Sequence, residues 1–225
     1  MKNVLPTILL ASIFIGVSKA SIVEDFDNGY DQQLFTISNS DPDSSFGVSE
    51  GKLVFNGDSY TGRDTSERGG CFVMQNKIYG DFTATAELSG FNAPLEGGGK
   101  FVLASICIWG NNGEIARIGR RKGYAANYDE VVVKINTEDA VSGYNQSFGT
   151  MKIERIGTTI NTYWDDTLVL SSFFGDTPVT IGLIAERWGT VSYFDAAFDD
   201  FTIVPEPCTL LLLGFGGLML RKRKS

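Results

Sequence analysis

The chain has 225 residues, of which 43% are hydrophobic, and it carries a formal net charge of −8 with no histidine. Without histidine, Ser-His-Asp and Cys-His catalysis and the usual zinc sites are excluded. The acidic balance also disfavours nucleic acid and anionic membrane surfaces as partners. The length suits one domain flanked by targeting segments.

The N-terminus has the pattern of a secretory signal peptide. A short positive segment is followed by an apolar stretch at residues 4–17, and Ser18-Lys19-Ala20 places small residues three and one positions before a cleavage point. The apolar stretch is too short to favour a permanent transmembrane helix. We therefore predict that signal peptidase cuts between Ala20 and Ser21, and that residues 1–20 take no part in the fold.

Residues 21–204 form the predicted domain, and they are more acidic than the whole chain. The two termini hold six of the 19 basic residues and one of the 27 acidic residues, which leaves the domain with a charge of about −13. Such a charge is compatible with neutral glycans or with divalent cations as ligands. It argues against a nucleic-acid partner.

Strand patterns run through this domain. Phe82, Ala84, Ala86 and Leu88 alternate with polar residues, which is the period of a sheet with one buried face. Residues 101–109 are almost continuously apolar, as in a strand covered on both sides. Further strands are predicted over residues 46–50, 53–56, 115–118, 130–135, 151–156, 159–164, 167–171, 179–186, 191–198 and 201–204.

Tight turns connect several of these strands. Two-residue turns are predicted at Gly51-Lys52, Gly157-Thr158 and Asp165-Asp166. We find no segment of ten or more residues with the 3.6-residue period of a helix. About a dozen short strands in one domain predict an all-β fold, an antiparallel double-sheet β-sandwich of the jelly-roll type.

The strand pattern resembles a known family, the concanavalin A-like lectins and glucanases. The meander from Lys152 to Asp166 is similar to two adjacent antiparallel strands of those domains, and residues 26–29 and 198–203 resemble their first and last strands. The resemblance covers most of residues 21–204. It implies a jelly-roll sandwich of a kind that binds or cleaves carbohydrate.

Glycan hydrolases of this family carry a Glu-x-Asp-x-x-Glu strand, which sets two carboxylates on one face. This chain contains no Glu-x-Asp sequence. The nearest candidates are Glu87, Glu154 and Glu186, each alone on its strand. Glu154 is flanked by Lys152 and Arg155, and Glu186 by Arg187, so ion pairing is the simpler explanation for these two. We therefore predict that the protein is not an enzyme, with a divergent glycan-cleaving enzyme as the alternative.

Carbohydrate is bound by aromatic faces together with planar polar groups. The predicted glycan contacts are Trp188, Tyr124 and Trp109 as platforms, with Arg187 and Asn127 as hydrogen-bonding groups. Trp188 and Tyr124 are the stronger candidates because they lie beside glycines in predicted loops. For Trp109, at the end of an apolar strand, a place in the core is the alternative.

A structural calcium ion is a further possibility, and it needs six to eight oxygen ligands. Asp25 and Asp27 open the domain, and Asp199 and Asp200 close it. First and last strands are commonly neighbours in jelly rolls, and similar carbohydrate-binding domains hold a calcium near their termini. These four carboxylates are therefore predicted ligands, with solvated turns as the alternative.

Two cysteines, Cys71 and Cys107, lie inside the domain, and Cys208 lies in the C-terminal tail. In an oxidising compartment a disulfide between Cys71 and Cys107 would contribute roughly 3–4 kcal/mol. Two buried free thiols on separate strands are the alternative. The sequence leaves both open.

The C-terminus has three ordered parts. Pro205-Glu206-Pro207 precedes an apolar run at residues 208–220 and four cations at residues 221–224. As a helix the run measures about 20 Å against a hydrocarbon core of roughly 30 Å, so it predicts a transient membrane anchor, with the cations on the cytoplasmic side.

This tail resembles the PEP-CTERM sorting signal of Gram-negative bacteria, with Cys208 where that family often has serine. The resemblance implies cleavage near Pro205, Glu206 and Pro207 by an exosortase-like membrane protease. Residues 205–225 are therefore predicted to be a sorting and anchor segment. An ordinary tail anchor is the alternative.

These patterns together predict an exported, non-catalytic protein of a Gram-negative bacterium. It would be anchored transiently in the inner membrane and then act at the outer surface or in the extracellular matrix, binding glycan or exopolysaccharide. The alternatives are a structural matrix or adhesion protein without a small ligand, and a divergent glycan-cleaving enzyme.

Overall fold

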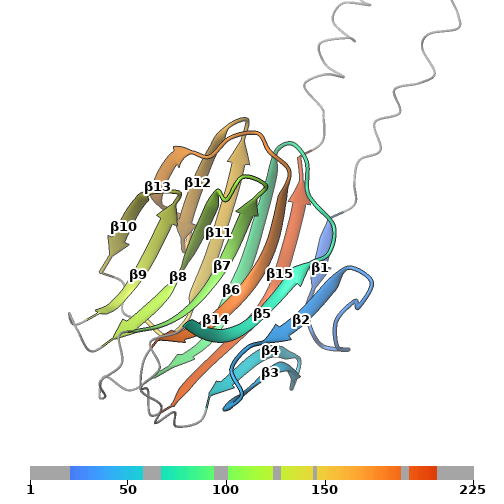
Figure 1. The fold of residues 1–225 in the computed structure, drawn as a ribbon, viewed down its shortest axis with the longest axis vertical. Helices are drawn as coiled ribbons and strands as arrows, with labels where there is room; N and C mark the ends of the chain where they lie inside the picture. Colours follow the sequence, from blue (N-terminus) through green and yellow to red (C-terminus); the bar gives the residue numbers. More distant parts are fainter. Residues whose placement is uncertain are drawn as a thin grey trace, which may run out of the picture.

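The computed structural model of the protein describes residues 21–57, 67–93, 101–123, 128–143, 146–188 and 193–206. These residues form two antiparallel sheets that stack on one another as a β-sandwich (Figure 1). The described part of the chain contains no helix, which confirms the all-β prediction. Accordingly, it includes no helix long and apolar enough to cross a membrane. The predicted signal peptide, Ala20 included, and residues 207–225 lie outside the described residues.

One sheet, here called sheet A, contains the strand order β13-β12-β11-β6-β15-β4-β3, and β1 also pairs with β15. Its strands are β1 (Ile22–Glu24), β3 (Ser44–Ser49), β4 (Lys52–Gly57), β6 (Phe82–Asn92), β11 (Gly149–Ile156), β12 (Thr159–Trp164), β13 (Thr167–Phe173) and β15 (Phe194–Pro205).

The other sheet, sheet B, has the order β10-β9-β8-β7-β14-β5-β2. Its strands are β2 (Phe35–Asn39), β5 (Glu67–Met74), β7 (Phe101–Gly110), β8 (Ile115–Gly123), β9 (Tyr128–Ile135), β10 (Glu138–Ser142) and β14 (Val179–Trp188). The chain crosses between the sheets several times, so strands distant in sequence become neighbours.

The tight turns follow the sequence closely. The connections at Gly157-Thr158 and Asp165-Asp166 lie where they were predicted, and both aspartates have positive φ, at 46° and 60°. That pair of angles is typical of a type I′ hairpin turn. The first hairpin differs by one residue: Ser49 pairs with Lys52, and the turn residues are Glu50 and Gly51, both with positive φ.

β2, β5 and β10 were not predicted, and several strand boundaries differ from the prediction. β8 and β9 extend beyond residues 118 and 130 towards each other, because charged residues such as Arg120 point into the sandwich and hide the strand pattern. Residues 194–205 form one strand, in which a register shift and the positive φ of Asp200 mark a bulge. The first strand is β1; residues 26–29 form a turn after it.

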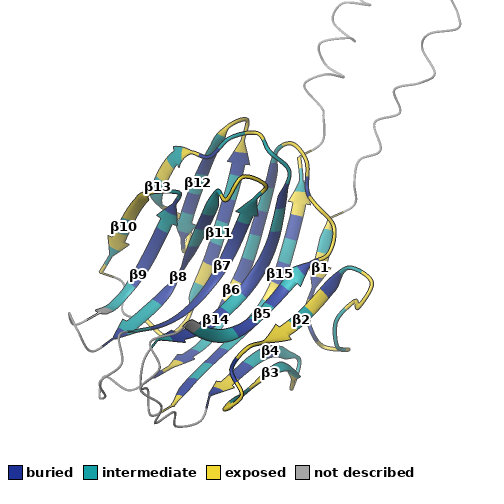
Figure 2. Ribbon diagram, viewed as in Figure 1, coloured by how far each residue is buried: buried dark blue, intermediate teal, exposed yellow. Residues whose placement is uncertain are grey.

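The core lies between the sheets, and burial differs between them (Figure 2). In sheet A, β6, β11 and β12 alternate buried and more exposed residues, which is the pattern of a sheet with one solvated face. In sheet B, β7 is buried continuously from Val102 to Ile108. Its outward residues are therefore covered as well, as the apolar run in the sequence predicted.

The two predicted cleavage points lie close together at one edge of the domain. β1 and β15 are antiparallel, with Ile22 opposite Ile203, so Ser21 lies close to the end of β15. Pro205 ends that strand, and the backbone N–H of Glu206 donates to the carbonyl of Asp81 at 3.0 Å. The first and last strands of the domain, β1 and β15, are therefore paired next to both predicted cleavage points.

Candidate functional site

The candidate site is the outer face of sheet B, which has a row of small or apolar residues across its middle. This central row takes one residue from each strand, and the register places them side by side: Ser38, Cys71, Ile184, Ser105, Gly119, Val132 and Val141. The row runs perpendicular to the strands. It ends at Ser38 on edge strand β2 and at Val141 on edge strand β10.

Charged residues lie on both sides of the central row. On one side Glu186, Arg121 and Glu130 occupy the next outward positions of β14, β8 and β9. On the other side Arg117 and Lys134 are opposite one another. Arg121 pairs with Glu130 on the neighbouring strand, while Arg117 reaches Glu186 at 2.9 Å. The described carboxylates Glu130 and Glu186 of this face are thus held by arginines.

Close approach of the strands keeps the central row shallow. A Cβ at Gly119 would lie 2.4 Å from Ser105 Cβ and 2.1 Å from the carbonyl oxygen of Ala104. Facing Cβ atoms in a sheet are normally about 4.5–5.5 Å apart. Gly69, beside Glu186, has the same restriction, with the carbonyl oxygen of Ala185 at 2.2 Å. Glycine is therefore required at both positions.

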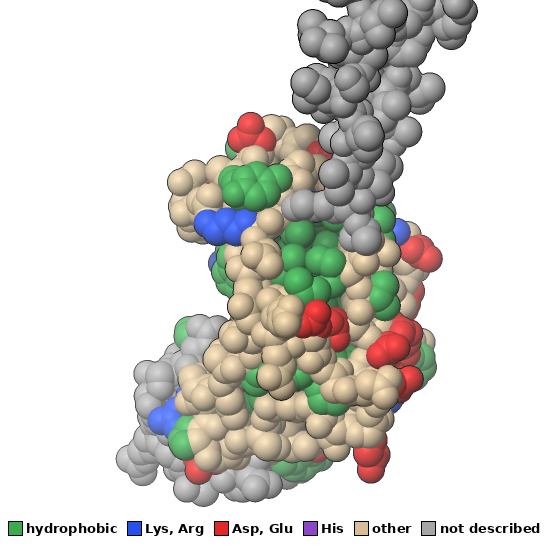
Figure 3. All heavy atoms as spheres, turned by 90° about the vertical axis from the view of Figure 1, so that its right-hand side faces the viewer, with side chains coloured by type: hydrophobic (Ala, Val, Ile, Leu, Met, Phe, Trp, Pro, Cys, Tyr) green, Lys and Arg blue, Asp and Glu red, His purple; other side chains and the backbone are tan. Residues whose placement is uncertain are grey.

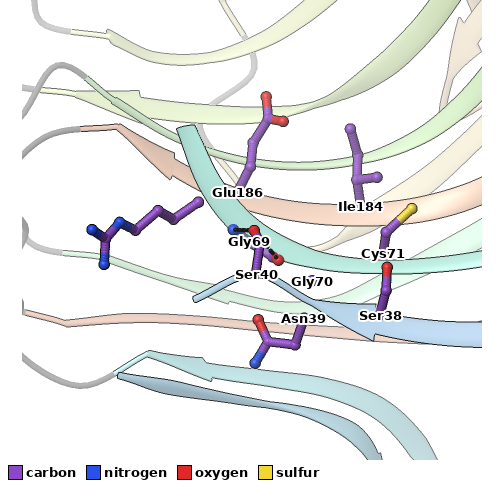
Figure 4. Close-up of a pocket in the computed structure, with 9 residues that line it drawn as sticks. Ser38, Asn39, Ser40, Gly69, Gly70, Cys71, Ile184 and Glu186 are labelled. Atoms are coloured by element: carbon purple, nitrogen blue, oxygen red, sulfur yellow. Dashed lines mark hydrogen bonds between the residues drawn. The ribbon is translucent and has the colours of Figure 1, made fainter. Parts of the chain in front are cut away.

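A hollow of about 280 Å³ opens at the β14-β5-β2 end of this face. Ser38, Cys71, Ile184 and Glu186 point the same way from these adjacent strands in Figure 4. The floor is low because Gly69 carries no side chain, and Ser40 ties the edge by donating to the carbonyl of Gly69 at 3.1 Å. The hollow joins apolar surface to hydroxyl groups, the carboxylate of Glu186 and the side chain of Arg68.

The predicted aromatic platforms lie on this face but do not meet. Trp188 is partly exposed at one end of β14, and its ring centroid is 5.4 Å from that of Phe101, an aromatic that the sequence did not single out. Trp109 is also partly exposed, at the opposite end of β7. The eight residue steps from Phe101 to Trp109 span about 27 Å, so the aromatics form two rims. Tyr124 and Asn127 lie outside the described residues.

Arg187 is not a surface group, and this corrects the sequence prediction. It is 1% exposed and points into the sandwich, where Nη2 donates to Asp41 Oδ1 at 2.9 Å and Nε lies 2.5 Å from Oδ2. Alternation along β14 explains the error, because adjacent residues of a strand face opposite sides. Glu186 faces outward, whereas Arg187 stabilises the β2–β3 connection through Asp41, which is itself 2% exposed.

The three candidate catalytic carboxylates do not converge. Glu87 and Glu154 face outward from sheet A, whereas Glu186 faces outward from sheet B. The expected sequence-neighbour ion pairs are also wrong. Glu154 accepts hydrogen bonds from Tyr163 Oη at 3.0 Å and Asn161 Nδ2 at 3.3 Å, and Glu186 pairs with Arg117.

The predicted calcium ligands Asp25, Asp27, Asp199 and Asp200 all lie among the described residues. Among them no three acidic, histidine or cysteine side chains are grouped to hold a metal ion. The first and last strands are neighbours, as expected, but the carboxylates have other contacts. Asp25 accepts the backbone N–H of Asp27, while Asp199 lies 3.7 Å from Lys52 Nζ and accepts the N–H of Asp200.

Acidic side chains nevertheless gather near β1. Figure 3, drawn from the side of the molecule where β1 and β2 lie, shows acidic groups next to hydrophobic ones. Glu24, Asp25 and Asp31 line a hollow there together with Tyr30 and Leu34. Burial raises the pKa of Glu24, and the charges of Asp31 and Asp25 add to the rise. This carboxylate therefore has like charges beside it.

The disulfide left open by the sequence is not formed. Cys71 and Cys107 are both free thiols, because β14 lies between their strands. Two strand spacings alone separate their Cα atoms by roughly 9–10 Å, and an offset of two residues along the strands adds to this, so a disulfide cannot reach. Burial, followed by the charge of Glu186, raises the pKa of Cys71 to about 12, and burial raises that of Cys107 as well.

Sequence reasoning missed Arg117, Arg121 and Ser105. Their only signal was the spacing of two arginines four residues apart in a short apolar strand. That spacing places both on one face once the strand is recognised. Their partners come from strands far away in the sequence, so the ion pairs themselves had no local signature.

Comparison with known proteins identifies the class of fold. No protein-family model matches the sequence, and no curated protein matches it. Among solved structures, a pseudo β-1,3-glucanase of Mycobacterium tuberculosis superposes with a TM-score of 0.61 and 13% identity, over 82% of this chain and 98% of that one. The domain therefore has the concanavalin A-like lectin and glucanase fold, as the resemblance implied.

Two further neighbours bind or recognise carbohydrate. LamA of Zobellia galactanivorans, in complex with laminaritriose and laminaritetraose, has a TM-score of 0.58 and 11% identity over 82% of this chain and 98% of its own. The carbohydrate recognition domain of Emp47p has a TM-score of 0.54 and 9% identity over 82% and 94%. The fold is thus shared by glucanases, a pseudo-glucanase and a carbohydrate recognition domain.

Proposed function

We propose that this protein is an exported, non-catalytic glycan-binding protein that uses the outer face of sheet B. The observation that carries the proposal is the make-up of that face. A shallow central row lies between two aromatic rims, and a hollow with hydroxyl and carboxylate groups opens at one end. Sugars present apolar ring faces and hydroxyl edges, which match such a surface.

The proposal excludes catalysis because of how the carboxylates are arranged. Glycoside hydrolysis uses two carboxyl groups about 5–9.5 Å apart, one of which must be protonated in turn. Glu186 and Glu130 are separated by three strand spacings, roughly 14 Å between Cα atoms. Each is also paired with an arginine on this face. Glu186 and Glu130 are therefore suited to fixing the arginine side chains of this face.

The delivery route is proposed from the two ends of the sequence. Signal peptidase would release Ser21, and an exosortase-like protease would act near Pro205-Glu206-Pro207 after transient anchoring in the inner membrane. The product would reach the outer surface or the extracellular matrix. Fractionation of the producing cells, with an antibody to the domain, tests this: intact protein in the cytosol would contradict it.

Glycan binding is tested by replacing one aromatic residue on the outer face of each sheet with alanine. Trp188→Ala removes a rim of the proposed site, while Tyr163→Ala changes the outer face of sheet A and serves as the control. We expect affinity for a polysaccharide such as laminarin, measured by calorimetry, to fall about tenfold in the first variant only. Loss of affinity in both variants, or no binding to any polysaccharide of a broad panel, would contradict the proposal.

A further inference from the structure

The ion pair between Arg117 and Glu186 crosses the central row. Arg117 lies on β8 and Glu186 on β14, and β7 runs between them. The two residues also lie on opposite sides of the central row, so the line joining them passes over Ser105 of β7. The pair is a bar across the face rather than a contact along it.

This bar is well held. The side chains of Arg117 and Glu186 are only 21% and 11% exposed, and Arg117 Nη1 donates to Glu186 Oε1 at 2.9 Å. Beneath it Ser105 is 0% exposed. Partly buried charge pairs are screened less by salt than exposed ones, and breaking one leaves a poorly solvated charge behind. A ligand would therefore meet a fixed obstacle.

The bar divides the central row into two unequal parts. On the β2 side lies the hollow, with Ser38, Cys71 and Ile184 along its length and Glu186 at its inner end. On the other side Gly119 and Val132 are buried. The hollow is smaller than the pockets of about 300–1,000 Å³ that take drug-sized ligands, so its size suits a short unit of a chain.

Unpaired polar atoms lie on two residues next to the lining of the hollow: Ser105 is opposite Ile184, and Arg117 pairs with Glu186. Among the described residues, neither Arg117 Nε nor Ser105 Oγ has a hydrogen-bond partner, although both atoms are buried. Such groups cost about 1–3 kcal/mol each when unsatisfied. A sugar hydroxyl that reached the bar would accept a hydrogen bond from Arg117 Nε. The same bar would stop any continuation of the chain.

We infer that the hollow binds the end of a neutral glycan chain, and that the Arg117–Glu186 pair determines this end-on mode by blocking passage across the sheet. The inference rests on the proposed glycan-binding function. The ligand is uncharged because the arginine and the carboxylate already neutralise one another, and because the domain carries about −13, which repels anionic polysaccharides.

The test counts protein molecules bound per glycan chain. Linear β-1,3-glucans of graded length are the probe, because a structural neighbour was solved with laminaritriose and laminaritetraose. We expect the natural protein to bind one molecule per chain at every length, by calorimetry. In R117A/E186A, which removes both charges together, the number should at least double on the longest chains.

Lys152→Ala is the control, since it breaks the ion pair with Asp166 on the outer face of sheet A and leaves the central row unchanged. It should keep one molecule per chain. Thermal melting by circular dichroism checks folding, and Arg117→Ala, which removes the longer half of the bar, replaces the double variant if that one unfolds.

Natural protein that binds in growing numbers along longer chains would refute the end-on mode while leaving glycan binding intact. The same holds if removal of the bar changes nothing. Failure of the natural protein to bind any of these chains would overturn both this inference and the proposed function for β-1,3-glucan.

Discussion

On sheet A, the outer face is organised by short contacts between neighbours: Lys152 lies over the ring of Tyr163 at 4.2 Å, and Glu154 accepts from the same tyrosine. On sheet B, Arg117 spans β7 to reach Glu186 and covers a serine with no exposed surface. The first face presents polar groups to solvent. The outer face of sheet B buries residues such as Ser105 on the side away from the core, which is unusual for a solvent-exposed surface that binds nothing.

This difference teaches where to look for function in a sandwich. Both faces belong to the same fold, and both contain aromatic and charged residues. Among the described residues, only the outer face of sheet B combines a hollow, crowded glycines and an ion pair between non-neighbouring strands. A surface whose side chains are held in place is preorganised, and preorganisation lowers the entropic cost of binding.

The largest expected effect concerns the two kinds of ion pair. Arg187→Met leaves Asp41 buried without its partner, so the free energy of unfolding should fall by about 3–5 kcal/mol. Lys152→Met breaks the pair with the 90% exposed Asp166 on sheet A and should cost under about 1 kcal/mol. Urea denaturation measures both. Equal losses would show that burial does not separate the two pairs.

A second prediction compares one glycine from each sheet. Gly119→Ala should destabilise the protein by about 1–3 kcal/mol, because the new methyl group has no room against β7. Gly90→Ala in β6 meets only the Cβ of Ala197 at 3.6 Å, so it should be neutral or stabilise by up to about 1 kcal/mol. If Gly119→Ala melted like the natural protein, the crowding of the outer face of sheet B would be disproved.

A third prediction concerns the reactivity of the Cys71 thiol, which lines the hollow. With its pKa raised to about 12, its thiolate should be roughly a thousandfold rarer at pH 8 than for an ordinary cysteine. In a Cys208→Ser background we expect no labelling by iodoacetamide in the folded protein and two labelled thiols after denaturation, by mass spectrometry. Rapid labelling of the native thiol would contradict the buried, anionic surroundings.

The smallest effect concerns the acidic hollow near β1. Because the folded-state pKa of Glu24 is raised, ionising this group costs stability as pH rises through that pKa. Glu24→Gln should therefore raise the melting temperature at pH 7 by a few degrees at most, and the gain should vanish below the ordinary glutamate pKa near 4. Asp165→Asn, in an exposed turn, is the control. A gain for Glu24→Gln that persisted at pH 3 would assign the effect to something other than charge.

Local sequence was enough to determine the class of fold and several details. Alternation in residues 82–88 predicted the one-sided burial of β6, and the continuous apolar run at 101–109 predicted a strand covered on both sides. The turns at 157–158 and 165–166 followed from residue types that tolerate positive φ. Each of these features is set by residues close together in the chain, and that is why the sequence determined them.

Tertiary structure alone decided the site. The central row draws one residue from each of seven strands, and the register between strands fixes which residues meet. Arg187 and Glu186 are adjacent in sequence, yet the pleat sends one into the core and the other to the surface. The fate of Cys71 and Cys107 likewise depended on β14 lying between them. Strand pairing joins residues that are far apart in the sequence, so the local pattern of residues does not predict it.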